Sequence, residues 1–162
     1  MRLKTNSMSD KLADLLATWF GCGYSPKAPG TAGSVGAVLP AAILAFAARW
    51  PPRSFAVLAA ALFAPAVWAA GDVARRKALE DPQIVVVDEV VGQWMTLAGA
   101  TTLNWKSLAA GFVLFRLFDI WKPWPVNRLE DLHGGLGIVA DDAMAAFYAA
   151  VVLFIAGCFN LY

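Results

Sequence analysis

The stretch AMAAFYAAVVLFIAGCFNLY, residues 143–162, contains no charged side chain. An α-helix needs roughly 20 apolar residues to cross the hydrocarbon core of a bilayer, and this stretch has about that length. Three further uncharged stretches occupy residues 28–48, 54–71 and 90–105. The chain of 162 residues is 59% hydrophobic and 15% charged, whereas a soluble domain is closer to half apolar and a quarter charged. These features predict a small multi-pass membrane protein.

The expected fold is all-α: a compact, membrane-embedded bundle of about five long helices with a short N-terminal amphipathic helix, forming one domain over residues 1–162. Apolar spacing and turn residues mark the helices. The short helix begins at a cap on Ser9 or Asp10 and ends near residue 20. The long helices are expected at 33–49, 55–79, 88–103, 107–121 and 141–162. A soluble protein with fully buried helices is the alternative, because alanine-rich helices are only weakly hydrophobic.

The charges separate along this expected topology. Following five crossings from Lys27, ten basic residues and all twelve acidic residues fall on or near one side. Only Arg49, Arg53 and Lys106 fall on the other side. An excess of lysine and arginine marks the cytoplasmic side, so we expect this charged side to face the cytoplasm. The net charge of +1 says little about partners, and no nucleic-acid partner is expected.

Five carboxylates are expected at helix ends on this side. Three separate helices supply them, and each carboxylate lies inside or against an apolar run. They are Asp88, Glu89, Asp119, Asp141 and Asp142. Ionisable groups at membrane depth are costly and persist where they pair or serve a function. Mg²⁺ prefers oxygen ligands of this kind, together with phosphate and water, so these residues are the candidate metal ligands.

Structural roles remain open for three of the five. Asp88 and Asp141 are expected in the first turn of a helix, where a carboxylate also complements the helix dipole. Asp119 lies late in its helix and can pair with Arg116 or Lys122, each one turn away. Asp142 has no such structural explanation, which favours a ligand role.

Basic and hydroxyl groups at the same end suggest a phosphate site. Arg116 and Lys122 can hold phosphate oxygens, as can Lys27, although such residues also bind lipid headgroups or snorkel. The segment GTAGS, residues 30–34, places Gly30, Thr31 and Ser34 just before the expected helix start, in the outline of a phosphate nest. Its alternative is a plain helix start with a hydroxyl cap.

The sequence gives little support for other kinds of catalytic or metal site. His133 is the only histidine, and a single loop histidine is more often incidental than catalytic. Cys22 and Cys158 are isolated, without the spacing of a disulfide framework or zinc site. The chain contains no Walker A motif and no Gly-x-Ser-x-Gly nucleophile elbow.

Four segments together resemble the bacterial phosphatidylglycerophosphatase A family. They are GYSPKAPGTAGS (23–34), VVVDEVVGQW (85–94), FRLFDIWKPWP (115–125) and HGGLGIVADDAMAA (133–146), and they occur in the family's order. The resemblance implies an all-helical enzyme of the bacterial inner membrane. Its reaction would be the Mg²⁺-dependent hydrolysis of the terminal phosphate of phosphatidylglycerophosphate, a lipid of the cytoplasmic leaflet, to phosphatidylglycerol and phosphate.

Within that resemblance, the five carboxylates bind one or two Mg²⁺ ions, which activate a water for in-line attack. Asp88, Glu89, Arg116 and Lys122 are the expected catalytic residues. Lys27, Gly30, Thr31, Ser34, Arg116 and Lys122 bind the substrate phosphate. An aspartyl-phosphate intermediate is the competing route, and the sequence leaves both open.

Two other membrane functions are alternatives. A transporter or channel would also carry intramembrane charges and broken helices, but here the charges gather at one end of the expected bundle. A structural membrane subunit would not need clustered acidic residues. Short alanine-rich helices can also need partners to bury their polar ends, so a homo-oligomer is an additional expectation.

Overall fold

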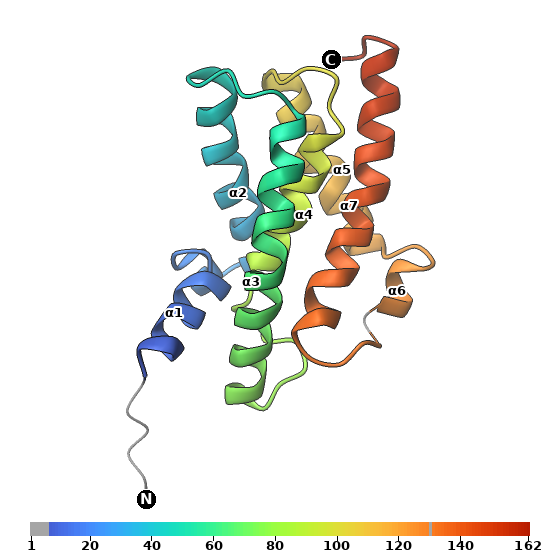
Figure 1. Cartoon of the computed structure of the whole chain (residues 1–162). Coiled ribbons are helices and arrows are strands. Elements are labelled where there is room, and N and C mark those ends of the chain that lie inside the picture. Colours follow the sequence, from blue (N-terminus) through green and yellow to red (C-terminus); the bar gives the residue numbers. More distant parts are fainter. Residues whose placement is uncertain (1–6, 130) are drawn as a thin grey trace, which may run out of the picture.

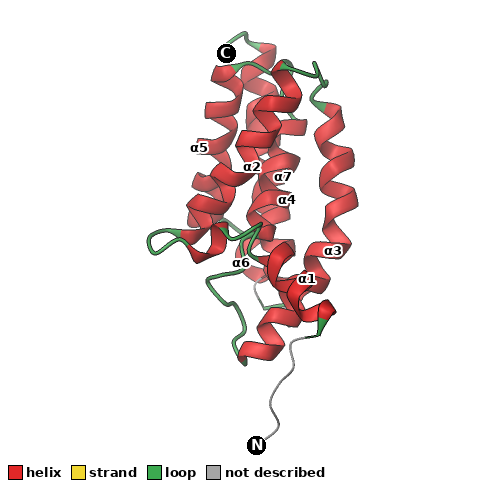
Figure 2. Ribbon diagram, turned by 90° about the vertical axis from the view of Figure 1, so that its left-hand side faces the viewer, coloured by secondary structure: helices red, strands yellow, loops and turns green. Residues whose placement is uncertain are grey.

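The computed structural model describes residues 7–129 and 131–162 and contains only helices in that part of the chain. The long helices α2 (Pro29–Phe46), α3 (Arg53–Lys77), α5 (Trp105–Trp121) and α7 (Gly135–Cys158) run roughly side by side around α4 (Val87–Ala98) (Figure 1). The short helices α1 (Met8–Ala17) and α6 (Val126–Leu129) lie toward one end of this bundle (Figure 2). A 3₁₀ turn, η1 (Cys22–Tyr24), precedes α2. The expected all-α bundle is therefore confirmed.

Helix α4 forms the centre of the bundle because nearly all of its side chains are buried. Val87, Val90, Val91 and Leu97 are fully buried, and Trp94 is 8% exposed. The indole Nε1 of Trp94 donates a hydrogen bond to the carbonyl oxygen of Ala37 in α2 at 3.1 Å. Satisfying this donor lets a large aromatic ring enter the core without a desolvation penalty.

Glycines allow the helix backbones to approach closely. A Cβ placed on Gly33 of α2 would lie 2.6 Å from the Cβ of Val86, just before α4. A Cβ on Gly135, at the start of α7, would collide with the carbonyl oxygen of Val67 and lie 2.6 Å from the amide nitrogen of Gly71. Backbone-to-backbone packing of this kind suits helices in lipid, where van der Waals contact replaces the hydrophobic effect.

Three helices are long and apolar enough to cross a membrane: α2, α3 and α7. Their outward faces carry exposed apolar side chains, including Leu39, Ile43 and Phe154. Five crossings were expected, but α4 has only 12 residues and spans about 18 Å at 1.5 Å per residue, against a core of about 30 Å. Its helix ends at Ala98, and its apolar run serves the interior of the bundle instead.

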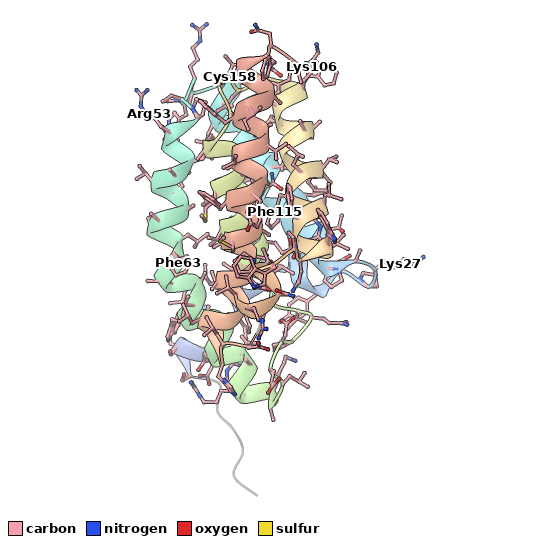
Figure 3. All side chains as sticks on the ribbon, turned by 90° about the vertical axis from the view of Figure 1, so that its right-hand side faces the viewer. Lys27, Arg53, Phe63, Lys106, Phe115 and Cys158 are labelled. Atoms are coloured by element: carbon pink, nitrogen blue, oxygen red, sulfur yellow. The ribbon has the colours of Figure 1, made fainter. Side chains whose placement is uncertain are left out.

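The basic residues predicted for the two sides lie in different parts of the bundle. Figure 3 shows Arg53 and Lys106 at one end, near Cys158, and Lys27 projecting sideways from the other half. This agrees with the predicted separation of these residues along the bundle. The cytoplasmic orientation of the Lys27 half stays a prediction.

Several helix ends differ from the expected positions. The cap of α1 is Ser7, which forms a reciprocal capping box with Asp10, so the predicted cap at Ser9 or Asp10 was wrong. Helix α2 begins at Pro29 instead of residue 33, because proline suits the first helical position. Helix α7 begins at Gly135 instead of Asp141, since the loop expected to run to residue 140 folds partly into α6 and the first turns of α7.

Candidate active site

A cavity of about 980 Å³ opens at the end of the bundle where α2, α4 and α7 begin and α5 ends. Its wall combines carboxylates, basic groups and glycines from these elements with residues of the α3–α4 and α6–α7 loops. The lining residues are Pro26, Ala28, Pro29, Gly30, Thr31, Glu80, Asp81, Gln83, Val85, Asp88, Glu89, Arg116, Asp119, Lys122, Asp131, Leu132, His133, Gly134, Gly137, Ile138, Asp141 and Asp142.

Three helix N-termini meet at this cavity. The residues preceding α2, α4 and α7 are Ala28, Val86 and Gly134, and none of them caps its helix with a side-chain hydrogen bond. The first backbone N–H groups of a helix have no intrahelical acceptor and form the positive end of the dipole. Their convergence favours an anion in the cavity.

Arg116 joins two carboxylates in the cavity wall. Its Nη1 contacts Oε2 of Glu89 and lies 2.8 Å from Oδ2 of Asp119. The same Glu89 oxygen accepts a hydrogen bond from Oγ of Ser34 at 3.0 Å. Glu89 and Asp119 are each 8% exposed, so this cluster holds two buried carboxylates against one guanidinium. Burial, and next the charge of Asp119, raise the pKa of Glu89, while Arg116 opposes that rise.

A glycine makes room for this cluster. A Cβ on Gly30, in the first turn of α2, would collide with Oε1 of Glu89 and lie 3.3 Å from Nη1 of Arg116. The backbone of α2 therefore lies directly against the Glu89–Arg116 pair. This close approach places the N-terminal amides of α2 beside the charged groups of the cavity.

Lys122 forms the second ion pair, with its Nζ 2.8 Å from Oδ2 of Asp141. Lys122 is the C-terminal cap of α5 and has a positive φ of 47°, and Pro123 follows it. A cation here complements the negative end of the α5 dipole. The cap conformation turns the chain at the cavity wall and presents the ammonium group to α7.

Asp88 and Asp142 complete the acidic wall. Asp142 is 4% exposed. In the described part of the chain, no hydrogen-bond partner is found for Oδ2 of Asp142 or Oδ1 of Asp88, and both atoms are buried. Burial, and next the neighbouring Glu89, raise the pKa of Asp88. A buried carboxylate oxygen without a donor is costly, and a bound cation would remove that cost.

The structure brings nine of the predicted site residues into the wall of one cavity: Gly30, Thr31, Asp88, Glu89, Arg116, Asp119, Lys122, Asp141 and Asp142. Lys27 and Ser34 are not among the lining residues. Lys27 is exposed and projects away from the bundle (Figure 3). Ser34 is fully buried and supports Glu89 from behind.

The structure also decides the three alternatives left open by the sequence. Asp141 lies in the second turn of α7, whose first turn contains no acidic residue, so it does not serve as the cap. Asp88 lies in the first turn of α4 and does complement its dipole. Asp119 pairs with Arg116, as one alternative required, yet it also lines the cavity.

Sequence reasoning missed part of the polar rim of the cavity. Glu80, Asp81, Gln83 and Asp131 line the cavity, and His133, which was given little weight, lines it too. The polar segment EDPQ at 80–83 was interpreted only as the break that ends the helix expected at 55–79. Its position directly before VVVDEVV was the signal that could have placed it at the site.

No three of the described histidine, cysteine, aspartate and glutamate residues stand close enough together to hold a metal ion. Arg116 draws Glu89 and Asp119 toward itself, and Lys122 draws Asp141. The unsatisfied oxygens of Asp88 and Asp142 nevertheless have the chemistry that a hard divalent cation needs. The residues present therefore fit such an ion, with Asp88 and Asp142 as its first candidate ligands.

Comparisons with known proteins agree with the chemistry of this cavity. The model of the family "Phosphatidylglycerophosphatase A" matches residues 15–157. A phosphatidylglycerophosphatase A of Escherichia coli is 38% identical over 144 residues, covering 88% of this chain and 82% of the relative. The phosphatidylglycerophosphatase A of Haemophilus influenzae is 36% identical over 142 residues, covering 86% and 85%.

A third relative carries a different name. It is a putative phosphatidylinositol-3-phosphatase of Bacteroides thetaiotaomicron, 39% identical over 150 residues, which cover 88% of this chain and 91% of the relative. No solved structure matches the chain significantly. The residues matched by the family model run from before α2 into the last turn of α7 and therefore include the elements that form the cavity.

Proposed function

The chain belongs to the phosphatidylglycerophosphatase A family and is a phosphatase, and from this premise we propose that it hydrolyses the terminal phosphate of phosphatidylglycerophosphate. The products are phosphatidylglycerol and inorganic phosphate, and the reaction belongs to phospholipid biosynthesis. One observation carries the proposal: three helix N-termini, two basic side chains and five carboxylates converge on one cavity beside apolar helices long enough to span a membrane.

The phosphate monoester binds where positive groups face the cavity. Amide groups at the starts of α2 and α7 hold its oxygens, together with Arg116 and Lys122. Both ion pairs of Arg116 use Nη1, and a guanidinium has five N–H donors, so Arg116 can hold a phosphate oxygen while keeping its carboxylates. Donors fixed in this way also stabilise the charge that develops on the transferring phosphoryl group.

Hydrolysis requires water to attack phosphorus in line with the ester oxygen. The new O–P bond forms as the P–O bond to glycerol breaks, water loses a proton, and the leaving alkoxide gains one. A carboxylate such as Glu89 accepts the proton from water. Asp88 and Asp142, with Asp119 and Asp141 nearby, would hold Mg²⁺, which would supply charge neutralisation and a more acidic water.

The active site faces the cytoplasm of a bacterial inner membrane in this proposal. The basic residues near the cavity then lie where the positive-inside rule places them. A phosphorylated headgroup in the cytoplasmic leaflet would reach the cavity directly. A transporter would need charged groups along a path through the bilayer, whereas the cavity gathers them where α2, α4 and α7 begin and α5 ends.

Phosphate release from phosphatidylglycerophosphate in mixed micelles tests this function. Purified protein should release phosphate with Mg²⁺, lose the activity with a chelator and regain it when Mg²⁺ returns. Asp88→Asn, Asp119→Asn and Asp142→Asn should each abolish release while the protein stays folded in detergent. Absence of Mg²⁺-dependent release by the wild type would refute the proposal, and liposome flux assays would then test transport.

A parallel assay with phosphatidylinositol 3-phosphate addresses the substrate, because one relative bears that name. We expect kcat/KM to be at least tenfold higher for phosphatidylglycerophosphate. The opposite ranking would keep the phosphatase and change its substrate.

A further inference from the structure

A second depression lies directly beside the active-site cavity. This outer groove has a volume of about 600 Å³ and runs along the last turns of α3 and the start of α7. It shares two lining residues, Glu80 and Gly134, with the cavity, so the two spaces adjoin at these residues. Its full lining is Val67, Trp68, Gly71, Asp72, Ala74, Arg75, Ala78, Leu79, Glu80, Gly134 and Gly135.

Glycine backbone forms part of the lining of the outer groove. Gly71 and Gly135 approach so closely that a Cβ on Gly71 would lie 3.1 Å from the amide nitrogen of Gly135. The walls carry partly exposed apolar side chains, Trp68 at 43% and Leu79 at 56%. Bare glycine backbone beside apolar side chains suits an extended, flexible ligand such as the glycerol backbone and first acyl carbons of a lipid.

Arg75 provides the positive charge of the outer groove, and its side chain is 75% exposed. It contacts Oδ1 of Asp72, while Arg76 Nε holds the other oxygen of Asp72 at 2.7 Å. An exposed ion pair contributes little, and Asp72 keeps Arg76 if Arg75 turns away. Arg75 can therefore exchange Asp72 for an anionic ligand without leaving a buried carboxylate unpaired.

The outer groove lies toward one end of a candidate membrane span. Helix α3 begins at Arg53, at the end of the bundle opposite to the Lys27 half (Figure 3), and is one of the three candidate membrane spans. The groove occupies the last turns of α3, next to the cavity. A ligand in it would lie where the acyl region of the bilayer meets the headgroups.

We propose that the outer groove binds the phosphodiester and glycerol backbone of the lipid substrate, with Arg75 on the diester phosphate and Trp68 against the first acyl carbons. This assignment rests on the proposed function, because it takes the lipid whose terminal phosphate enters the cavity. The substrate then passes Glu80 and Gly134, with one phosphate on each side of them. Arg75 and Trp68 thereby act in substrate recognition and make no contact with the reacting phosphate.

Inhibition by the two products separates the groove from the cavity. Phosphatidylglycerol keeps the diester phosphate and acyl chains, whereas inorganic phosphate resembles only the terminal group. Loss of one charge-assisted contact should cost about a factor of ten in affinity. Arg75→Gln should therefore raise both the KM for phosphatidylglycerophosphate and the Ki of phosphatidylglycerol about tenfold, and leave the Ki of phosphate within twofold.

Matched variants control for general effects. Lys77→Gln removes an exposed cation from the same last turn of α3, outside the outer groove, and should leave KM within twofold. Trp68→Ala should raise KM several-fold, whereas Trp105→Ala, which removes a tryptophan 71% exposed at the start of α5, should not. Equal effects of Lys77→Gln and Arg75→Gln, or a tenfold weaker phosphate Ki in Arg75→Gln, would overturn the assignment.

A binding measurement keeps this test independent of catalysis. Phosphatidylglycerol should raise the melting temperature of the wild type and of Lys77→Gln in detergent more than diacylglycerol does, and this excess should disappear in Arg75→Gln. If the wild type shows this binding but hydrolyses no phosphatidylglycerophosphate, the proposed function fails and the groove stands. If it hydrolyses the lipid and Arg75→Gln keeps both its KM and the melting shift, the groove fails alone.

Discussion

Replacing Arg116 by methionine gives the most direct test of the cavity's electrostatics. Arg116 is the shared partner of Glu89 and Asp119, and the three side chains are 17%, 11% and 11% exposed. Methionine has a similar length and no charge, so the change leaves two shielded carboxylates facing each other without their cation. Removing one partner of a buried ion pair typically costs about 3–5 kcal/mol.

For a chain of this size, each kcal/mol lowers the melting temperature by roughly 2–4 °C, so we expect a fall of about 6–20 °C in detergent. The control is Arg53→Met, an exposed cation at the opposite end of the bundle, which should change stability by no more than about 0.5 kcal/mol. Circular dichroism melts of the purified variants provide the measurement.

A second substitution shows whether the cost arises from stranded charge. Adding Glu89→Gln to Arg116→Met removes one of the two unpaired carboxylates and should recover at least about 1 kcal/mol of the loss. The reasoning is refuted if Arg116→Met melts within 2 °C of the wild type, or if Glu89→Gln makes that variant less stable.

Three further substitutions test the packing of the protein. Two lie beside the Glu89–Arg116 pair, and one lies at the contact between α3 and α7. Ser34→Ala removes the hydroxyl that donates to Glu89 and should cost about 1–3 kcal/mol, measured by thermal unfolding, with Ser9→Ala at an exposed site as the control. Gly30→Ala should lower kcat/KM for phosphate release at least tenfold, because its methyl group would displace Glu89; an unchanged rate would contradict the close approach. Gly135→Ala should lower the melting temperature by several degrees, because its Cβ meets the α3 backbone near Val67; a melt matching the wild type would argue against the backbone contact between α3 and α7.

Much of the site could be predicted from the sequence because its residues occur in short segments of unusual composition. Asp88 and Glu89 interrupt a run of valines, and Asp141 and Asp142 precede a run of alanines. Carboxylates so placed are too costly to be incidental. Their positions at helix ends followed from where the apolar runs begin, and that was enough to expect them at one end of a bundle.

Two residues predicted to bind phosphate, Ser34 and Lys27, do not line the cavity, and each case has a physical reason. Ser34 was expected to bind phosphate because a helix start was placed near it, but α2 begins at Pro29, four residues before the expected start at residue 33. At 3.6 residues per turn, that shift moves Ser34 into the second turn, where it faces the core and Glu89. Lys27 lies in the loop before α2, and nothing in its local sequence shows which way it projects.

The sequence by itself determined the helical fold, the three longest apolar helices and the identity of the charged residues, because apolar runs and their interruptions are local properties of the chain. Only the tertiary structure decided which charges meet. Arg116 and Glu89 are 27 positions apart, and Ser34 and Glu89 are 55 apart, so their contact depends on how closely α2 and α5 approach α4. Glycines set these approaches, and their effect is visible only when the opposing backbone or side chain is in place.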